Sequence, residues 1–293
     1  MNRIYLSGGI GNQLFQISFA HFLQSQNNSN VQVVKLSTNK GPIHSRLSFF
    51  QNSTECSHCE LRINRGMPFF NDIINPWNRS QNRSLGLRVL DYRHEPFIKP
   101  LEIELKGNRF TYLGYFQNKE FVLPIQDSLI SDIKKILTNY DLPSELMSKD
   151  FQYEVIHIRQ GDTKTFRNLK RVGILSGGYY SSVLLRKIRV SEGSKRIVIT
   201  DDKSGAHQVL RGIKYDALYG PDDLSPYQAL KVMASAGSLI TANSTFSWWG
   251  GLLAMENGAE VIIPQPFFIS PELSADEALA YPGFSQAHSS FIN

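Results

Sequence analysis

Short apolar runs recur through the second half of the chain and alternate with segments of helical spacing. The runs predict strands at Val155–Ile158, Arg196–Thr200, Ser238–Thr241 and Glu260–Ile263, the last stopped by Pro264. The segments between them predict four helices. The first covers Tyr179–Ile188, the second begins directly after a cap at Asp201 or Asp202, the third lies between Pro221 and Ala236, and the fourth covers Ser244–Asn257 and is closed by Gly258. This alternation is typical of an α/β fold whose parallel sheet is covered by helices on both faces.

The first half is less regular. We predict strands at Ile4–Leu6, Val31–Leu36, Leu87–Leu90 and Tyr112–Tyr115, and helices at Asn12–Gln24 and Asn118–Asn139, with a possible break at Pro124. Residues 37–84 are rich in Asn, Ser, Arg and Gly and predict long loops with short helices. Irregular segments of this length are usually functional or mobile.

A chain of 293 residues is long for one hydrophobic core and suits two domains. The stretch from Asp141 to Asp150 has the composition of a connection between them. We therefore predict domains at residues 1–149 and 150–293.

The formal net charge of +5 comes from dispersed Lys and Arg residues, without the basic stripe of a nucleic-acid binder. It suits anionic small molecules, with at most loose contact with an anionic membrane face. We expect neither a transmembrane helix nor a signal peptide. Cys56 and Cys59 are too few ligands for a closed zinc site, and two thiols fit a reducing, cytoplasmic compartment.

Three segments carry candidate chemistry, and the first is Val155–Asp162. Arg159 stands where the predicted strand ends, at the edge of a parallel sheet where ligands bind. Its planar guanidinium matches a phosphate, so the segment predicts recognition of a nucleotide diphosphate. The structural alternative is a surface ion pair between Arg159 and Asp162.

The second segment, Ser7–Gln16, places a glycine cluster between a strand and a helix, where a ligand can approach the backbone. It does not match the dinucleotide-binding fingerprint, because Leu14 stands where the third glycine belongs, and no P-loop lysine follows. A tight structural turn explains it equally well.

The third segment, Thr241–Leu253, begins a helix at Ser244 or Thr245, where hydroxyls and backbone N–H groups form an anion site. Phe246, Trp248 and Trp249 could pack against a base or sugar, or could belong to the core. Elsewhere, Asp201 and Asp202 could accept hydrogen bonds from a ribose or a guanine, although helix capping explains one of them. No Asp-x-Asp occurs, so a metal-bridged diphosphate site lacks obvious ligands.

Taken in order, the motifs at 8–16, 157–162 and 243–251 resemble those of the α-1,2-fucosyltransferases, family 11 of the glycosyltransferases. Leu113–Gln117, Gly178–Tyr180 and Ile199–Asp202 add further matches, so the resemblance extends to about residue 264. Gln160 departs from the pattern, which usually has a second Arg there. We also expect no N-terminal membrane anchor of the kind that the animal enzymes have, so the chain resembles a bacterial member.

The resemblance implies a GT-B architecture, in which two Rossmann-like domains with parallel sheets face a central cleft. It implies an acceptor-side domain at 1–149 and a GDP-fucose-binding domain at 150–293. The implied reaction is metal-independent and inverting, with no cofactor: L-fucose passes from GDP-β-L-fucose to the 2-hydroxyl of a terminal galactose. The implied setting is bacterial surface polysaccharide or O-antigen synthesis, on an oligosaccharide or lipid-linked glycan, in the cytoplasm or peripherally at the inner face of the cell membrane.

By position, the resemblance assigns Arg159 to the departing diphosphate, and His157 and Asp162 to the loop around it. Further donor-binding residues would be Asp201, Asp202, Asn243, Ser244, Thr245 and Phe246, with Gly9, Gly11, Asn12 and Gln13 facing the cleft from the other domain. No general base stands out among the candidates Asp162, His44, Asp91 and Glu95.

Two other functions stay open. One is a related fucosyltransferase that makes α-1,6 linkages or modifies protein, against which the segment at 243–249 argues. The other is a protein that binds a nucleotide sugar without turnover. Acceptor specificity is expected in residues 37–100, and no nucleic-acid partner is expected.

Overall fold

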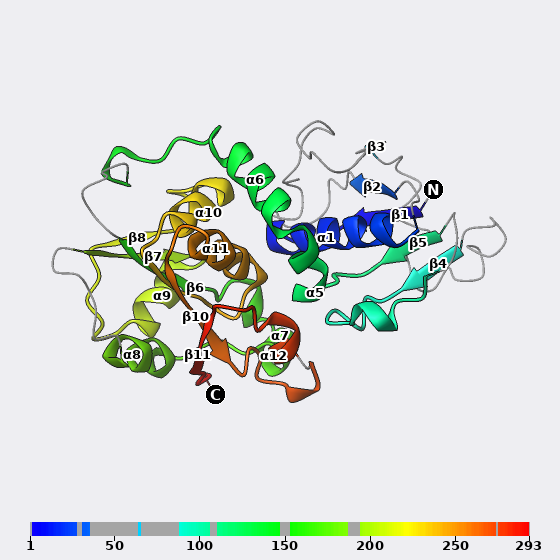
Figure 1. The fold of residues 1–293 in the computed structure, drawn as a ribbon. Helices are drawn as coiled ribbons and strands as arrows, with labels where there is room; N and C mark the ends of the chain where they lie inside the picture. Colours follow the sequence, from blue (N-terminus) through cyan, green and yellow to red (C-terminus); the bar gives the residue numbers. More distant parts are fainter. Residues whose placement is uncertain are drawn as a thin grey trace. The chain divides into compact units, whose positions relative to one another are not determined.

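The computed structural model describes residues 2–27, 31–35, 64–65, 88–105, 110–146, 153–186, 194–273 and 275–292. Cys56, Cys59 and His44 lie outside these ranges. The chain divides into two compact units, Met1–Ile136 (unit 1) and Leu137–Asn293 (unit 2), coloured from blue to green and from green to red in Figure 1. Within the described ranges, no helix combines the length and apolar character needed to cross a bilayer.

Unit 1 is built on a parallel sheet of five strands in the order β3-β2-β1-β5-β4. The strands are β1 (Asn2–Leu6), β2 (Val31–Lys35), β3 (Asn64–Arg65), β4 (Arg88–Asp91) and β5 (Phe110–Leu113). The helices are α1 (Ile10–Asn27), the 3-10 turns η3 (Pro100–Glu102) and η4 (Leu123–Ile125), α5 (Lys119–Val122) and α6 (Gln126–Leu137), which crosses into unit 2. The predicted helix over Asn118–Asn139 is therefore interrupted at Pro124, as its missing N–H requires.

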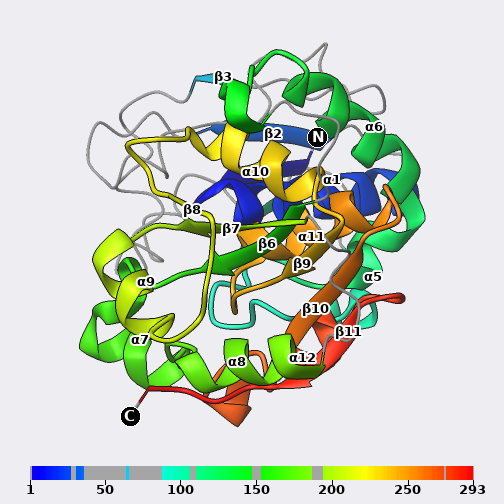
Figure 2. The same ribbon diagram turned by 90° about the vertical axis from the view of Figure 1, so that its left-hand side faces the viewer.

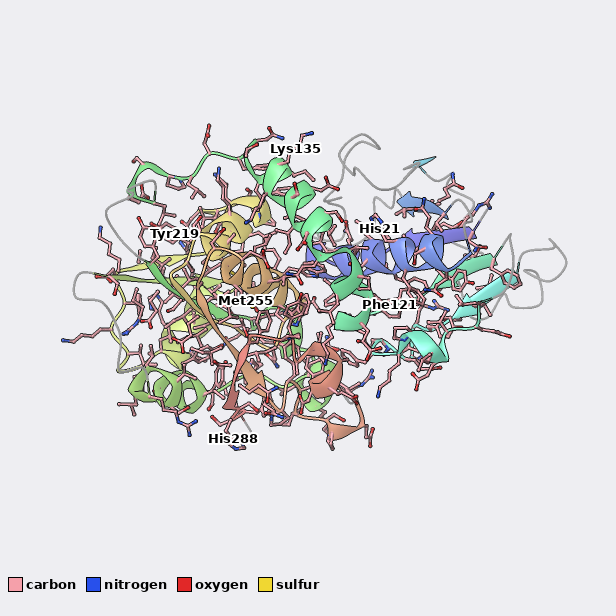
Figure 3. All side chains as sticks on the ribbon, viewed as in Figure 1. His21, Phe121, Lys135, Tyr219, Met255 and His288 are labelled. Atoms are coloured by element: carbon pink, nitrogen blue, oxygen red, sulfur yellow. The ribbon has the colours of Figure 1, made fainter. Side chains whose placement is uncertain are left out.

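Aromatic packing joins α1 to its neighbours in unit 1. The ring of Phe19 stacks on Phe116 with centroids 3.7 Å apart and meets Tyr112 of β5 edge-on at 5.5 Å. Phe121, labelled on α5 in Figure 3, packs edge-on against Phe19 and Phe22. This cluster holds α1 against the sheet and so fixes the glycine turn that precedes the helix.

Unit 2 contains a parallel sheet of six strands in the order β11-β10-β9-β6-β7-β8. The strands are β6 (Tyr153–Ile158), β7 (Lys195–Thr200), β8 (Ala217–Tyr219), β9 (Ser238–Ile240), β10 (Glu260–Gln265) and β11 (Ser285–His288). Numbered within the unit, the order is 3-2-1-4-5-6, the strand order of a dinucleotide-binding Rossmann sheet. The α/β class with two parallel sheets is thus confirmed.

Helices cover both faces of the unit 2 sheet, as Figures 1 and 2 show. They are α7 (Phe166–Arg171), α8 (Gly177–Arg186), α9 (Lys203–Val209), α10 (Pro226–Ala234), α11 (Thr245–Met255) and α12 (Ala275–Leu279), with 3-10 turns η5 (Ser144–Leu146), η6 (Asp162–Lys164) and η7 (Pro271–Leu273). Ile156 and Ile158 of β6 pack in one cluster with residues of α8 and α9. On the opposite face, Ala254 of α11 packs on Val261 of β10.

The bounds of β10 and α10 differ from the sequence prediction. Strand β10 does not stop at Pro264 but continues to Gln265. It pairs with β9 only as far as Ile262, whereas its pairing with β11 continues to Gln265 and so extends the strand past the proline. The helix predicted from Pro221 begins only at Pro226, where Ser225 and Gln228 form a capping box.

Candidate functional site

The order of strands in unit 2 reverses between β6 and β9. From β6 the chain builds outwards through β7 and β8, and then returns to the other side of β6 to form β9. The two strands pair in parallel, with Ile156 opposite Ile240. Their carboxyl ends therefore open at the same place, which is where sheets of this kind bind ligands.

The two loops that leave this edge are joined by a side-chain hydrogen bond. Arg159 follows the last residue of β6, and its Nη1 donates to Oγ of Ser244 at 3.1 Å. Ser244 is also the N-cap of α11, since its Oγ accepts the N–H of Phe246 at 3.3 Å. Residues 85 positions apart in sequence thus present a guanidinium beside a helix N-terminus. Both features attract anions, and a phosphate fits the pair.

The aromatic residues of α11 divide between two roles. Trp248 and Trp249 are completely buried, and the indole N–H of Trp248 donates to the carbonyl of Leu279 at 2.8 Å. They belong to the core, which leaves Phe246, partly exposed in the first turn, as the aromatic ring near the site.

His157 lies under the site, only 5% exposed, with its ring 5.9 Å from that of Phe246. Burial, with a smaller contribution from the charge of Arg159, lowers the pKa of His157 to about 3, so the imidazole is neutral at pH 7. Within the described ranges, its Nδ1 is one of three buried side-chain atoms without a hydrogen-bond partner, with Thr241 Oγ1 and Asn243 Oδ1. All three belong to the ends of β6 and β9 or the residues just beyond, and unpaired buried polar atoms are uncommon in folded proteins.

Asn243 also has a structural task. Its Nδ2 donates to the carbonyls of Val172 and Gly173, both at 3.0 Å, and so ties the loop after α7 to the end of β9. Thr245 is buried in the first turn of α11. Asn243, Ser244, Thr245 and Phe246 are therefore gathered beside Arg159.

Asp201 holds the loop that carries Arg159. Its two carboxylate oxygens accept the backbone N–H groups of Gln160 at 2.8 Å and Gly161 at 3.0 Å. A Cβ on Gly161 would lie 2.8 Å from Asp201 Oδ2, so only glycine lets the carboxylate approach this closely. Gln160 is buried, with its Nε2 3.4 Å from the carbonyl of Gly205. It turns into the protein rather than adding to the charge of the site.

Asp202 is the N-cap of α9, as capping at this position predicts. Its carboxylate accepts the N–H of Gly205 at 3.0 Å and pairs with Lys164. The backbone hydrogen bond from Gly205, followed by that from Lys164, lowers the pKa of Asp202. The sequence analysis did not predict a role for Lys164. It ends the 3-10 turn η6 that follows Gly161, and this turn brings its side chain back to Asp202 at the carboxyl edge of the sheet.

Replacement of Asp201 by alanine is expected to lower the free energy of unfolding by about 1 kcal/mol, because two backbone amides lose a charged acceptor at a solvent-exposed place. Urea unfolding measures the loss, and hydrogen exchange should show faster exchange at Gln160 and Gly161. Asp222→Ala, which removes an exposed carboxylate of the same unit, is the matched control and should change neither quantity. Equal behaviour of the two variants would contradict the role of Asp201 in holding the loop.

In unit 1, the predicted residues Gly9, Gly11, Asn12 and Gln13 lie where β1 passes into α1. Gln13 donates from Nε2 to the carbonyl of Gly8 at 3.0 Å, and Gly8 has a φ of +76° that favours glycine. The segment that follows the neighbouring strand β5 contributes two contacts that sequence reasoning missed. Gln117 Nε2 donates to Asn12 Oδ1 at 2.8 Å, and Gln16 Nε2 donates to the carbonyl of Gly114 at 2.7 Å. The result is a cluster of uncharged amides at the carboxyl edge of unit 1.

The four candidate bases have different surroundings. Asp91, at the end of β4, forms a two-pronged ion pair with Arg93, at 2.6 and 2.9 Å, and Glu95 is exposed. The backbone of Asp162 begins η6, but its side chain lies outside the described part of the structure, as does His44. No base is assigned by these contacts.

Residues 87–280, more than half of the chain, match the sequence profile described as "Glycosyl transferase family 11". The chain is 25% identical to an alpha-1,2-colitosyltransferase of Escherichia coli, over 92% of this chain and 93% of that protein. It is 23% identical to the O-antigen biosynthesis glycosyltransferase WbnK of Escherichia coli, over 90% of this chain and 93% of that protein.

Among solved structures, the fucosyltransferase NodZ from Bradyrhizobium superposes with a TM-score of 0.51 at 13% identity, over 86% of this chain and 92% of that one. The likeness concerns the fold: two parallel α/β sheets, the GT-B architecture.

Proposed function

The chain belongs to glycosyltransferase family 11, and from this premise we propose that it transfers L-fucose from GDP-β-L-fucose to the 2-hydroxyl of a terminal galactose. The product is an α-1,2-fucoside, formed with inversion at the anomeric carbon. The proposal makes unit 2 the donor-binding unit and unit 1 the acceptor-binding unit.

One observation carries the proposal: at the point where the strand order reverses, Arg159 Nη1 donates at 3.1 Å to Oγ of Ser244, the N-cap of α11. A diphosphate bound there would receive bidentate hydrogen bonds from the guanidinium and further ones from the first turn of the helix. Of the three unpaired polar atoms beneath it, Thr241 Oγ1 and His157 Nδ1 can donate to an anion, whereas Asn243 Oδ1 only accepts. Asp201 and Asp202, both engaged in holding loops, are weaker candidates for the nucleoside.

The chemistry follows as a single displacement. The acceptor oxygen forms a bond to the anomeric carbon of fucose while the bond from that carbon to the β-phosphate oxygen breaks. GDP leaves with the electron pair, and the hydroxyl proton passes to a base or to water. Arg159 and the helix N-terminus stabilise the negative charge that develops on the leaving diphosphate. We propose that these groups replace a metal ion, so that transfer continues in EDTA.

The acceptor belongs to a bacterial surface glycan in this proposal, either a free oligosaccharide or a lipid-linked one. The relative WbnK is an O-antigen biosynthesis glycosyltransferase, which supports that setting. We propose a cytoplasmic location with at most peripheral contact with the inner face of the cell membrane. Of the uncharged amides at the start of α1, we propose the half-buried Asn12 for contact with a sugar hydroxyl, with the buried Gln117 holding it from behind.

A second candidate donor is GDP-colitose, because one relative is an alpha-1,2-colitosyltransferase. Colitose is L-fucose without its 3-hydroxyl, so the two donors differ by one hydrogen-bonding group. A site that binds this hydroxyl can reject the deoxy sugar by a factor of about 10⁴.

A donor panel tests the proposal. The purified chain is incubated with GDP-fucose or GDP-colitose and a panel of β-1,3- and β-1,4-galactosides, with and without EDTA, and the products are analysed for linkage. We expect α-1,2-fucosylated product, with turnover at least about 100-fold higher for GDP-fucose than for GDP-colitose. The reverse preference would transfer the assignment to colitose, an α-1,6 product would reject the linkage, and GDP binding without turnover would indicate a non-catalytic protein.

A further inference from the structure

Two adjacent tyrosines at the start of α8 are bound to the two strands that flank the site. The hydroxyl of Tyr179 donates to the carbonyl of Thr241, and the hydroxyl of Tyr180 donates to the carbonyl of His157, both at 3.2 Å. The side chains are 0% and 1% exposed. One turn of one helix thus binds the ends of both β6 and β9.

The two carbonyls lie immediately before the site residues. His157 precedes Arg159 by two residues, and Thr241 precedes Ser244 by three. Each peptide unit is rigid and planar, so the direction of the His157 carbonyl also fixes the N–H of Ile158, from which Arg159 continues. The tyrosines therefore constrain the same two chain segments that the hydrogen bond between Arg159 and Ser244 joins at the edge of the sheet.

Packing alone does not account for the hydroxyls. Both rings belong to the core cluster between α8, α9 and the sheet, where phenylalanine would bury the same ring without a polar group. A buried hydroxyl costs free energy unless it is hydrogen-bonded, and each of these two hydroxyls donates a hydrogen bond to one backbone carbonyl. Burial raises the pKa of both tyrosines far above their ordinary values, so the hydroxyls remain protonated donors.

A glycine lets the start of α8 lie close to the end of α9. A Cβ on Gly177 would clash with the carbonyl oxygen of Val209, a backbone atom at the end of α9. Only glycine allows this approach, which brings together the two helices that share the core cluster of Tyr179 and Tyr180.

We propose that Tyr179 and Tyr180 are positioning residues of the donor site, which set the spacing between Arg159 and the N-terminus of α11 through the carbonyls of His157 and Thr241. The inference rests on the proposed function, because the site that they position is the one that binds the diphosphate.

Tyr180→Phe tests this role, with GDP as the ligand and isothermal calorimetry as the measurement. We expect the variant to bind GDP about 5- to 10-fold more weakly than the wild type, the scale of one lost hydrogen bond. The matched control is Tyr153→Phe. Tyr153 opens β6 at its opposite end, and its hydroxyl also donates to a backbone carbonyl, that of Glu145 at 3.1 Å. This control should bind GDP within twofold of the wild type.

A double-mutant cycle separates positioning from general stability. In an Arg159→Ala background, Tyr180→Phe should change GDP affinity less than twofold, because the group that it positions is gone. An undiminished 5- to 10-fold effect in that background would overturn the inference, as would wild-type affinity in the single variant. If Tyr180→Phe does not fold, Tyr179→Phe takes its place, and Ser244→Ala replaces Arg159→Ala as the background of the cycle, because Tyr179 binds the segment that leads to Ser244. A wild-type chain that does not bind GDP would instead overturn the proposed function.

Discussion

Arg159→Ala is expected to lower kcat about 100- to 1,000-fold, equivalent to about 3–4 kcal/mol of lost transition-state stabilisation. The guanidinium lies beside the N-terminus of α11, hydrogen-bonded to Ser244, where charge would develop on the departing GDP. Without it, the helix N-terminus alone would meet that charge. Initial rates with GDP-fucose and a galactoside acceptor measure the effect.

Arg159→Lys is the matched variant for this experiment, because it keeps the charge but loses the planar fork. We expect its kcat to lie between those of the wild type and the alanine variant. An unchanged urea midpoint in both variants would show that the fold survives, since Arg159 is only half-buried. If the alanine variant retained near-normal turnover, Arg159 would not be the group that stabilises the leaving diphosphate.

The second large effect concerns stability in acid. The pKa of His157 is about 3 in the folded protein, below the value of about 6.5 expected in the unfolded chain. Between these values the unfolded chain binds a proton that the folded protein does not. The contribution of the neutral His157 to the free energy of unfolding is therefore fully present above pH 6.5. As the pH falls, this contribution decreases by about 1.4 kcal/mol per pH unit, and the total loss at pH 3 is about 4–5 kcal/mol.

His157→Gln removes this titration while keeping a polar side chain. From pH 6 to pH 4 the wild type should lose about 2–3 kcal/mol more of its unfolding free energy than the variant. Urea unfolding followed by tryptophan fluorescence measures both, since Trp248 and Trp249 are buried in the same unit. Other acidic groups titrate in both proteins, so only the difference between the two pH profiles reports on His157. Parallel profiles would contradict the prediction, because they would show that His157 accepts a proton without a loss of stability.

The central strands of unit 2 could be predicted from the sequence because they are buried on both faces and read as continuous apolar runs. Val155–Ile158 and Arg196–Thr200 correspond to β6 and β7 to within two residues. Edge strands have no such pattern: β8 has three residues and β11 is mostly polar, and neither was predicted. Their pairing depends on a neighbouring strand rather than on their own composition.

The candidate site could be predicted in its parts but not in its connections. Glycine turns, a strand-end arginine and a helix cap are local patterns, and so they identified Arg159, Ser244 and Asp202. The carboxylate of Asp201 holds the amides of Gln160 and Gly161, although it lies 41 and 40 residues further along the chain. A contact over this distance leaves no local pattern from which it could be predicted. The hydroxyl contacts of Tyr179 and Tyr180 are invisible to sequence reasoning for the same reason.

The direct pairing of β6 with β9 has a consequence for how such a chain can vary. The distance between Arg159 and Ser244 depends on the register of the two strands and on the hydrogen bonds of Tyr179 and Tyr180, and not on the total length of the 80 or so residues that join them. Insertions and deletions in the loops of that connection leave the pair in place, provided that the two strands keep their register and α8 keeps its contacts. The same two side chains can therefore meet in chains whose connecting loops differ in length.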